Sequence, residues 1–91
     1  RAQKLVRDMG LKDTTCRTAS LLLYLAQEYG VKRSNGIRID LKLTQQELAN
    51  MIGTTRETIS RVLNKFKEKD IIKTAHKKMI INDLEQLKDF I

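Results

Sequence analysis

Residues 43–63 read LTQQELANMIGTTRETISRVL and contain the start and the end of one helix, followed at once by the start of another. Thr44, with Glu47 three residues later, has the pattern of a capping box and predicts a helix over about 45–52. Gly53 favours the left-handed backbone that ends such a helix. The first half of this stretch therefore predicts a short, well-delimited helix.

The second helix begins directly after this turn. Thr54 or Thr55 caps it, and it extends to about Glu68. Its apolar residues recur at spacings of three and four, which places them on one side: Ile59, Val62, Leu63 and Phe66. A short helix and a longer one joined in this way predict a helix-turn-helix whose second helix docks on the core by one face only.

The opposite side of the second helix is polar. At about 100° per residue, Glu57 and Arg61 fall opposite the apolar stripe, Ser60 flanks them, and Arg56 lies nearer the edge. Arginine can donate two hydrogen bonds to guanine, and a carboxylate can accept one from cytosine. We predict Arg56, Glu57, Ser60 and Arg61 as base-reading residues, with Glu57 held by Arg61. The alternative for Arg56 is a phosphate contact, because it lies towards the edge of the polar face. Two plainer interpretations stay open: a solvated surface, or Glu57 as the capping partner of Thr54.

Two segments outside the helices have β character. Residues 37–43, IRIDLKL, alternate strictly and predict a half-buried strand. Residues 71–81 contain two short β-prone runs around the basic turn 75–78, which predicts a hairpin, here called the wing. The fold class expected is mainly α with a small antiparallel β-sheet (α+β), a winged helix-turn-helix.

The N-terminal part divides at Gly10. Residues 1–9 predict a short helical remnant or a linker, which Gly10 interrupts. Asp13 or Thr14 caps a helix to about Tyr29. Several of its apolar residues recur at helical spacing: Ala19, Leu22, Leu23, Ala26 and Tyr29. We therefore divide the chain into residues 1–12 and a winged helix-turn-helix domain over 13–91, with the reading helix at about 55–68 and the wing at about 71–81.

Two turns complete the outline. Residues 31–36 are polar, and Asn35-Gly36 favours a tight reversal, so this segment predicts a solvated turn. Asn82, with Glu85 three residues later, predicts the start of a last helix. That helix would carry its apolar residues along one face: Leu84, Leu87 and Ile91.

Charge is concentrated in one stretch. The 91 residues carry a net charge of +7, and residues 54–78 alone hold eight basic and three acidic groups. Such a density predicts a polyanion partner, most simply nucleic acid. We expect phosphate contacts near the two helix starts and in the wing, from Thr44, Gln45, Thr55, Thr58, His76, Lys77 and Lys78.

The amino-acid composition argues against several other classes of function. One cysteine (Cys16), one histidine and no convergent carboxylates argue against an enzyme or a metal site, so we expect no catalytic residue, metal or cofactor in this domain. The longest apolar run is far too short to cross a membrane, and we expect a cytoplasmic protein. The alternative function is a winged helix that serves as a protein–protein interaction module.

Three strings resemble the DNA-binding domain of the CRP/FNR family of bacterial transcription regulators: LTQQELA at 43–49, GTTRETISRVL at 53–63 and IKTAHKK at 72–78. The family's base-reading positions correspond to Arg56, Glu57, Ser60 and Arg61. The Glu, Ser and Arg trio resembles the FNR branch, which reads TTGA-type half-sites. Arg56 resembles the cyclic-AMP receptor branch, which reads TGTGA-type half-sites.

This resemblance implies a regulator that recognises palindromic double-stranded DNA with TGA-containing half-sites. Family members act as homodimers and carry an N-terminal sensor domain, which is absent here, so its effector stays open. Residues 1–10 would match the end of the dimerisation helix and the hinge. In some members the segment matching 31–36 contacts RNA polymerase, a possible further partner; here it is shorter and carries Lys32 and Arg33.

Overall fold

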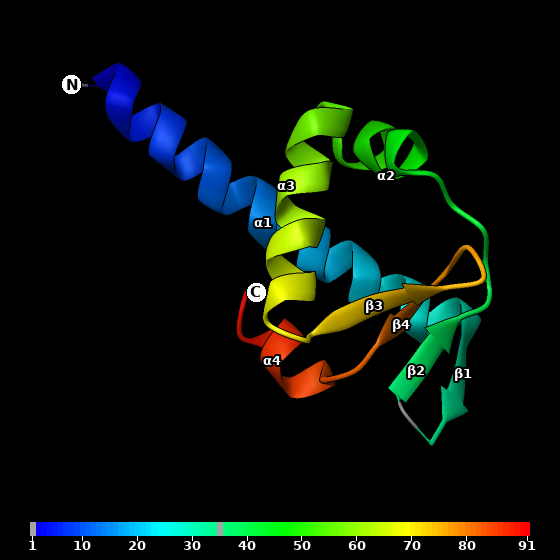
Figure 1. The fold of residues 1–91 in the computed structure, drawn as a ribbon. Helices are drawn as coiled ribbons and strands as arrows, with labels where there is room; N and C mark the ends of the chain where they lie inside the picture. The colour runs from blue at the N-terminus through cyan, green and yellow to red at the C-terminus, as the bar shows by residue number, and fades with distance from the viewer. Residues whose placement is uncertain (1, 35) are drawn as a thin grey trace.

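The computed structural model describes residues 2–34 and 36–91, with side chains for 13–34 and 36–91. It confirms the fold class, an α+β winged helix-turn-helix with a small antiparallel sheet (Figure 1). The elements in order are α1 Ala2–Tyr29, β1 Gly30–Arg33, β2 Gly36–Ile39, α2 Gln45–Ile52, α3 Arg56–Glu68, β3 Ile72–Ala75, β4 Lys78–Ile81 and α4 Leu84–Lys88.

Helix α1 corrects the expectation for the N-terminal part. It runs unbroken from Ala2 to Tyr29, so Gly10 does not interrupt it, and Asp13 and Thr14 lie inside it instead of capping it. A glycine in a helix costs only about 1 kcal/mol relative to alanine, which helical residues on both sides can outweigh. The N-terminal half of α1 projects beyond the rest of the chain (Figure 1).

The sheet contains one strand that the sequence did not predict. Its order within the described residues is β1-β2-β4-β3, all antiparallel. The solvated turn expected at 31–36 is wrong for residues 31–33, which belong to β1 and pair with β2. Asn35 lies outside the described residues. Gly36 has φ +132°, and a Cβ there would lie 2.2 Å from the carbonyl oxygen of Ile81, so the position requires glycine.

The strand predicted over 37–43 ends early, at Ile39. Ile39 pairs with Met79, and β4 begins one residue away at Lys78, so residues beyond Asp40 have no strand beside them. The alternation still predicted burial, because Leu41 and Leu43 pack against the core although they make no ladder.

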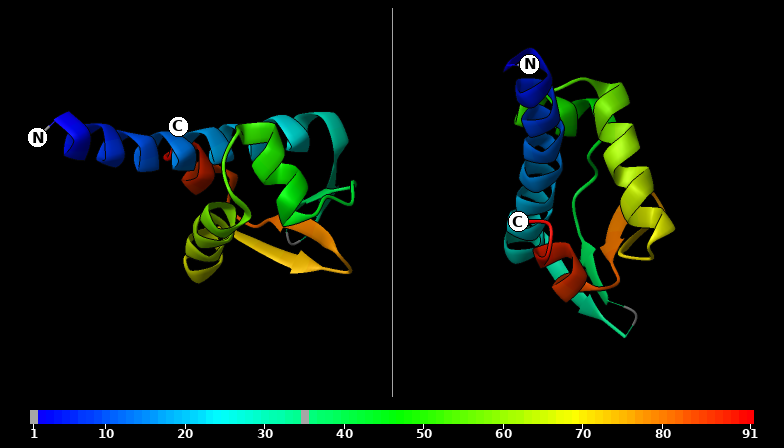
Figure 2. Two further views of the ribbon diagram at one scale, coloured as in Figure 1. Left: turned by 90° about the horizontal axis from the view of Figure 1, so that it is seen from above. Right: turned by 90° about the vertical axis from the view of Figure 1, so that its left-hand side faces the viewer.

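The core forms where the four helices and the sheet meet. Its largest fully buried side chains include Phe66, Leu22, Ile59, Leu63 and Ile71. Two residues of the predicted apolar helix faces lie outside it: Tyr29 and Ile91 are exposed. The last helix is capped by Asp83, whose carboxylate accepts from the Gln86 backbone N–H, and not by Asn82. In both views of Figure 2, α3 lies to one side of α1. The outer side of α3 therefore faces away from the rest of the domain.

Candidate nucleic-acid interface

The first helix of the motif has the predicted capping box. The Thr44 hydroxyl accepts from the Glu47 N–H at 3.1 Å, and the Glu47 carboxylate accepts from the Thr44 N–H at 2.8 Å. At the other end Gly53 adopts the left-handed conformation, with φ +85°, and donates to the Ala49 carbonyl at 2.8 Å. These local bonds define both ends of α2 and the direction in which the chain enters α3.

Helix α1 is fastened to the end of α2. The Arg17 guanidinium donates to the carbonyl of Ile52, one of the last carbonyls of α2, and also to the Asp13 carboxylate at 3.1 Å. An arginine at this position satisfies a carbonyl that the helix cannot bond internally and favours the negative end of its dipole. The contact joins the long helix to the turn between α2 and α3.

Thr55, rather than Thr54, caps α3. Its hydroxyl accepts from the Thr58 N–H at 3.2 Å and lies 2.9 Å from the Thr58 hydroxyl. Glu57 is therefore not the third residue of the cap, and its interpretation as the capping partner of Thr54 is wrong. The buried side of the helix is the one predicted: Ile59, Val62, Leu63 and Phe66.

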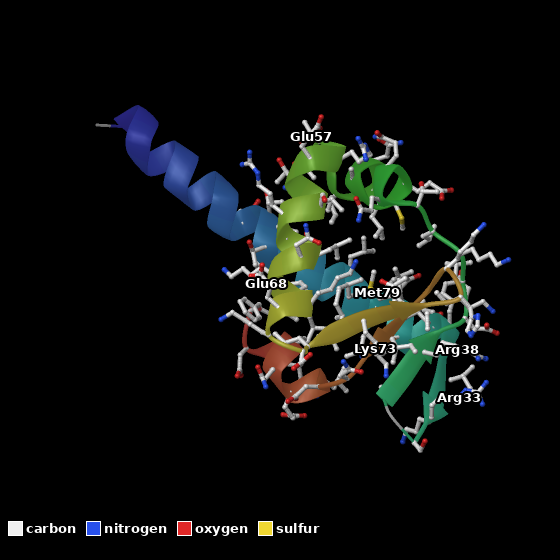
Figure 3. The ribbon with its side chains drawn as sticks, in the orientation of Figure 1. Arg33, Arg38, Glu57, Glu68, Lys73 and Met79 are labelled. Carbon is white, nitrogen blue, oxygen red and sulfur yellow. The ribbon has the colours of Figure 1, made fainter. Side chains whose placement is uncertain are left out.

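The four predicted base-reading residues lie on the outer side of α3. Arg56, Glu57 and Arg61 are exposed, and Ser60 is half-buried. Glu57 points away from the domain at the N-terminal end of the helix (Figure 3). Among the residues whose side chains are described, no ion pair joins Glu57 to Arg61, so the expectation that Arg61 holds Glu57 is wrong for the free chain. All four groups can therefore reach a ligand in front of the helix.

The predicted phosphate-binding residues divide into two groups. The hydroxyls of Thr44, Thr55 and Thr58 already take part in helix caps, and Gln45 is half-buried at the start of α2. The wing residues His76 and Lys77 are exposed and occupy the two-residue turn between β3 and β4. Both have positive φ, 54° and 64°, a pair typical of the tight type I′ hairpin turn.

Lys78 is engaged within the domain. Its ammonium group donates to the Asp40 carboxylate, which also lies 3.8 Å from the Arg38 guanidinium. The hydrogen bond from Lys78 and its charge, with smaller effects of Arg38 and Arg33, lower the pKa of Asp40 below its ordinary value. Lys78 is thus less free than Lys77 to meet a phosphate.

A basic groove beside the wing was missed from the sequence. It is open to solvent, and six basic side chains line it: Lys32, Arg33, Arg38, Lys42, His76 and Lys78. Arg33 and Arg38 are seen together at the β1–β2 end of the sheet (Figure 3). The signal available was the alternation at 37–43, which places Arg38 and Lys42 on the polar side of one strand. The sequence did not reveal that β2 pairs with β4 of the wing, which brings these side chains beside the wing residues.

The part of the chain that the structure describes contains neither a membrane-spanning helix nor a cluster of metal-binding side chains. No helix there combines the length and the apolar character needed to cross a membrane. Nor do three or more His, Cys, Asp or Glu side chains of those residues gather where they could hold a metal ion.

Comparison with known proteins places this arrangement among regulators. Residues 16–90 match the family described as the Crp-like helix-turn-helix domain. The chain is 36% identical over 81 residues to the global nitrogen regulator of Synechocystis, and 35% identical over 80 residues to the CRP-like cAMP-activated global transcriptional regulator of Mycobacterium tuberculosis. These matches cover 89% and 88% of this chain, but only 36% of each relative.

The fold has a solved counterpart. The CO-dependent transcription factor CooA from Carboxydothermus hydrogenoformans superposes with a TM-score of 0.83 at 34% sequence identity. The superposition covers 98% of this chain and 41% of that one.

Proposed function

Because the chain belongs to the Crp-like helix-turn-helix family, we propose that it binds double-stranded DNA sequence-specifically, with α3 in the major groove of a TGA-containing half-site. The family match and the named relatives, which are transcription regulators, support a general role in DNA-binding transcription regulation. The chain spans about a third of those relatives, so the proposal concerns this domain first.

The observation that carries the proposal is the outer side of α3. Arg56, Glu57 and Arg61 are exposed in its first two turns, while the opposite side is buried in the core. A helix held by one face can place such side chains against base edges. TGA contains one G·C pair, which offers guanine O6 and N7 to an arginine and the cytosine N4 amino group to Glu57. The resemblance to both family branches supports this half-site and leaves its flanking bases open.

Phosphate contacts would surround the reading helix. His76 and Lys77 extend from the wing turn, and the basic groove supplies further cations beside it. The N-termini of α2 and α3 add backbone N–H groups and the positive ends of two helix dipoles. These contacts fix the position of the domain on the duplex and give affinity that depends strongly on salt.

In the whole protein we expect two copies on a palindromic site. Two α3 helices related by a two-fold axis would read two half-sites about one helical turn apart. Helix α1 leads away from the domain and supplies the connection expected of a dimerisation helix (Figure 1). Contact of RNA polymerase with the β1–β2 hairpin stays a prediction.

Salt dependence separates this proposal from the protein–protein module. We expect the logarithm of the association constant for a specific duplex to fall linearly with the logarithm of salt concentration. The slope should be about −0.9 for each phosphate neutralised. Fluorescence anisotropy of a labelled duplex across a salt series measures this slope. Affinity that does not change with salt, and that is equal for all sequences, would overturn the proposal in favour of a protein partner.

Chemical interference tests the groove. Dimethyl sulfate methylates guanine N7 in the major groove and adenine N3 in the minor groove, so one reagent supplies both the test and its control. We expect N7 methylation within the half-site to prevent binding and N3 methylation to be tolerated. The reverse pattern would contradict major-groove reading.

A further inference from the structure

A cavity of about 140 Å³ lies between α3 and the wing. Its inner wall is apolar, and its members come from α1, the β2–α2 connection, α2, α3 and the sheet: Leu22, Leu25, Ile39, Leu41, Leu43, Leu48, Leu63 and Met79. Five of them, Leu22, Leu25, Ile39, Leu48 and Leu63, belong to the buried core. The cavity therefore reaches from the surface into the centre of the domain.

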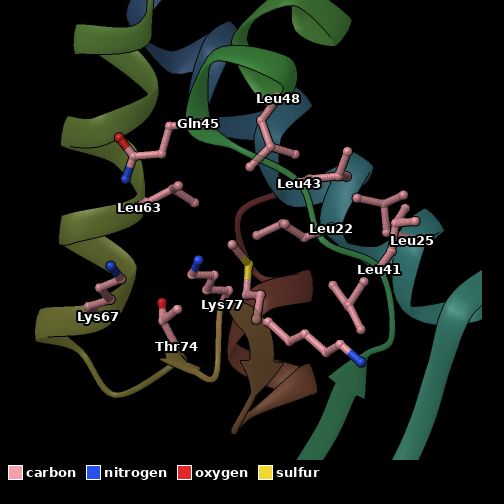
Figure 4. Close-up of a pocket in the computed structure, with 13 residues that line it drawn as sticks. Leu22, Leu25, Leu41, Leu43, Gln45, Leu48, Leu63, Lys67, Thr74 and Lys77 are labelled. Atoms are coloured by element: carbon pink, nitrogen blue, oxygen red, sulfur yellow. The ribbon is translucent and has the colours of Figure 1, made fainter.

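The solvent side of the cavity is polar and basic. Gln45, Lys67, Thr74 and Lys77 lie together on the side of α3 and the wing, across from Leu22, Leu43 and Leu48 (Figure 4). Among the residues whose side chains the structure describes, no acidic one lines the cavity. Of its three lysines, Lys78 is paired with Asp40, whereas Lys67 and Lys77 make no ion pair among the residues whose side chains are described.

Size and charge together define the ligand class. An apolar cavity of about 150 Å³ is large enough to bind benzene, so this one has room for an apolar body of about six carbons. Two ammonium groups, an amide and a hydroxyl at the opening are donors suited to a carboxylate. We propose that this cavity binds a small monocarboxylate, with its apolar body against the leucines and its carboxylate between Lys67 and Lys77.

The effect of this ligand on DNA affinity rests on the proposed DNA binding. Binding of the ligand to the cavity does not depend on that proposal. Lys77 belongs to the wing turn that would meet a phosphate, so a carboxylate held there competes for its charge. The ligand should then weaken DNA binding, by about twofold to tenfold for one lost phosphate contact.

The test uses the chain without DNA, so its failure is distinguishable from failure of the proposed function. Methyl spectra, recorded by NMR with isotope-labelled leucine and methionine, are followed during titration with benzoate. At about 10 mM, a ligand with Kd near 1 mM occupies most of the protein. We expect saturable shifts of Leu22, Leu48, Leu63 and Met79, and much weaker binding of benzamide, which has the same shape without the charge.

Variants locate the site. Lys67→Gln and Lys77→Gln should each weaken benzoate about tenfold, because each removes one charged donor. Lys73→Gln is the matched control, since Lys73 is an exposed lysine of β3 that does not line the cavity. Leu43→Phe should fill the cavity and abolish binding, and the surface lysine variants keep the test informative if that variant does not fold.

Two results would overturn the proposal. One is the absence of saturable methyl shifts with benzoate. The other is binding of benzoate and benzamide with equal affinity, unchanged by Lys67→Gln and Lys77→Gln, which would remove the carboxylate from the account.

Discussion

Replacing Arg61 with Ala separates base reading from general attraction to DNA. The guanidinium is exposed and has no ion-pair partner among the described side chains, so we expect the free energy of unfolding to change by less than about 0.5 kcal/mol. On the specific duplex, loss of a bidentate contact with guanine costs about 1–3 kcal/mol. That cost raises Kd about 5- to 160-fold at 25 °C.

On random-sequence DNA the same substitution removes only one positive charge. Lys88→Ala is the matched control for charge. Lys88 is the last residue of α4, and α4 lies by the C-terminal end of α3, away from the first turns of α3 (Figure 1). We expect that variant to raise Kd less than about twofold on either duplex, since salt screens distant charges. Anisotropy titrations of a palindromic TGA duplex and a scrambled duplex, with urea unfolding of each variant, give all of these quantities.

The refuting result is an equal loss on both duplexes. Arg61 would then be a phosphate contact, because phosphates carry no sequence information directly. A large loss of stability would equally contradict the reasoning, since it would mean that the exposed guanidinium supports the fold.

Three further predictions concern the scaffold. Phe66→Ala removes a fully buried ring and should lower the free energy of unfolding by about 3–5 kcal/mol; a wild-type urea midpoint would contradict this. Lys78 lowers the pKa of Asp40, so the stabilising effect of the carboxylate is present above its unfolded-state pKa of about 3.9 and is lost as pH falls through the lower folded-state pKa. Asp40→Asn should lack this acid-side loss in urea unfolding across pH, and an unchanged profile would refute the role of the pair. Arg17→Met removes the bond to the Ile52 carbonyl and should speed amide exchange in the turn after α2 about fivefold, as expected for about 1 kcal/mol; unchanged exchange would show that the contact adds nothing there.

Local signals predicted the functional motif well. The Thr44 and Glu47 capping box and the end of α2 at Gly53 depend only on neighbours in the chain, and both are confirmed. The one-sided apolar stripe of α3 likewise follows from helical geometry, and its four members are buried. Burial of the apolar side of α3 turns the opposite side of the same helix outward. The outer positions of four residues follow directly: Arg56, Glu57, Ser60 and Arg61.

The wrong or missing predictions fall into two groups. In one, a local signal fitted two residues equally well; in the other, residues far apart in the sequence determine the structure. Thr54 and Thr55 offer the same hydroxyl, and only the turn geometry selects Thr55 as the cap. Every residue of β1 is exposed, so hydrophobic alternation could not reveal it, and it forms through backbone pairing with β2. The pair of Asp40 with Lys78 spans 38 positions. The basic groove was missed for the same reason, since it exists only once β2 and the wing are neighbours.

We propose that the outer side of α3 determines which DNA sequence the domain recognises. Selection of duplexes from a random pool by the full-length protein tests it most directly, with wild type and a Glu57→Ala, Arg61→Ala double variant carried through in parallel. We predict that the wild type enriches a palindrome of TGA-containing half-sites and that the double variant loses the preference while it still retains DNA. Enrichment of the same palindrome by both proteins would contradict the account, because the sequence would then be read by another surface.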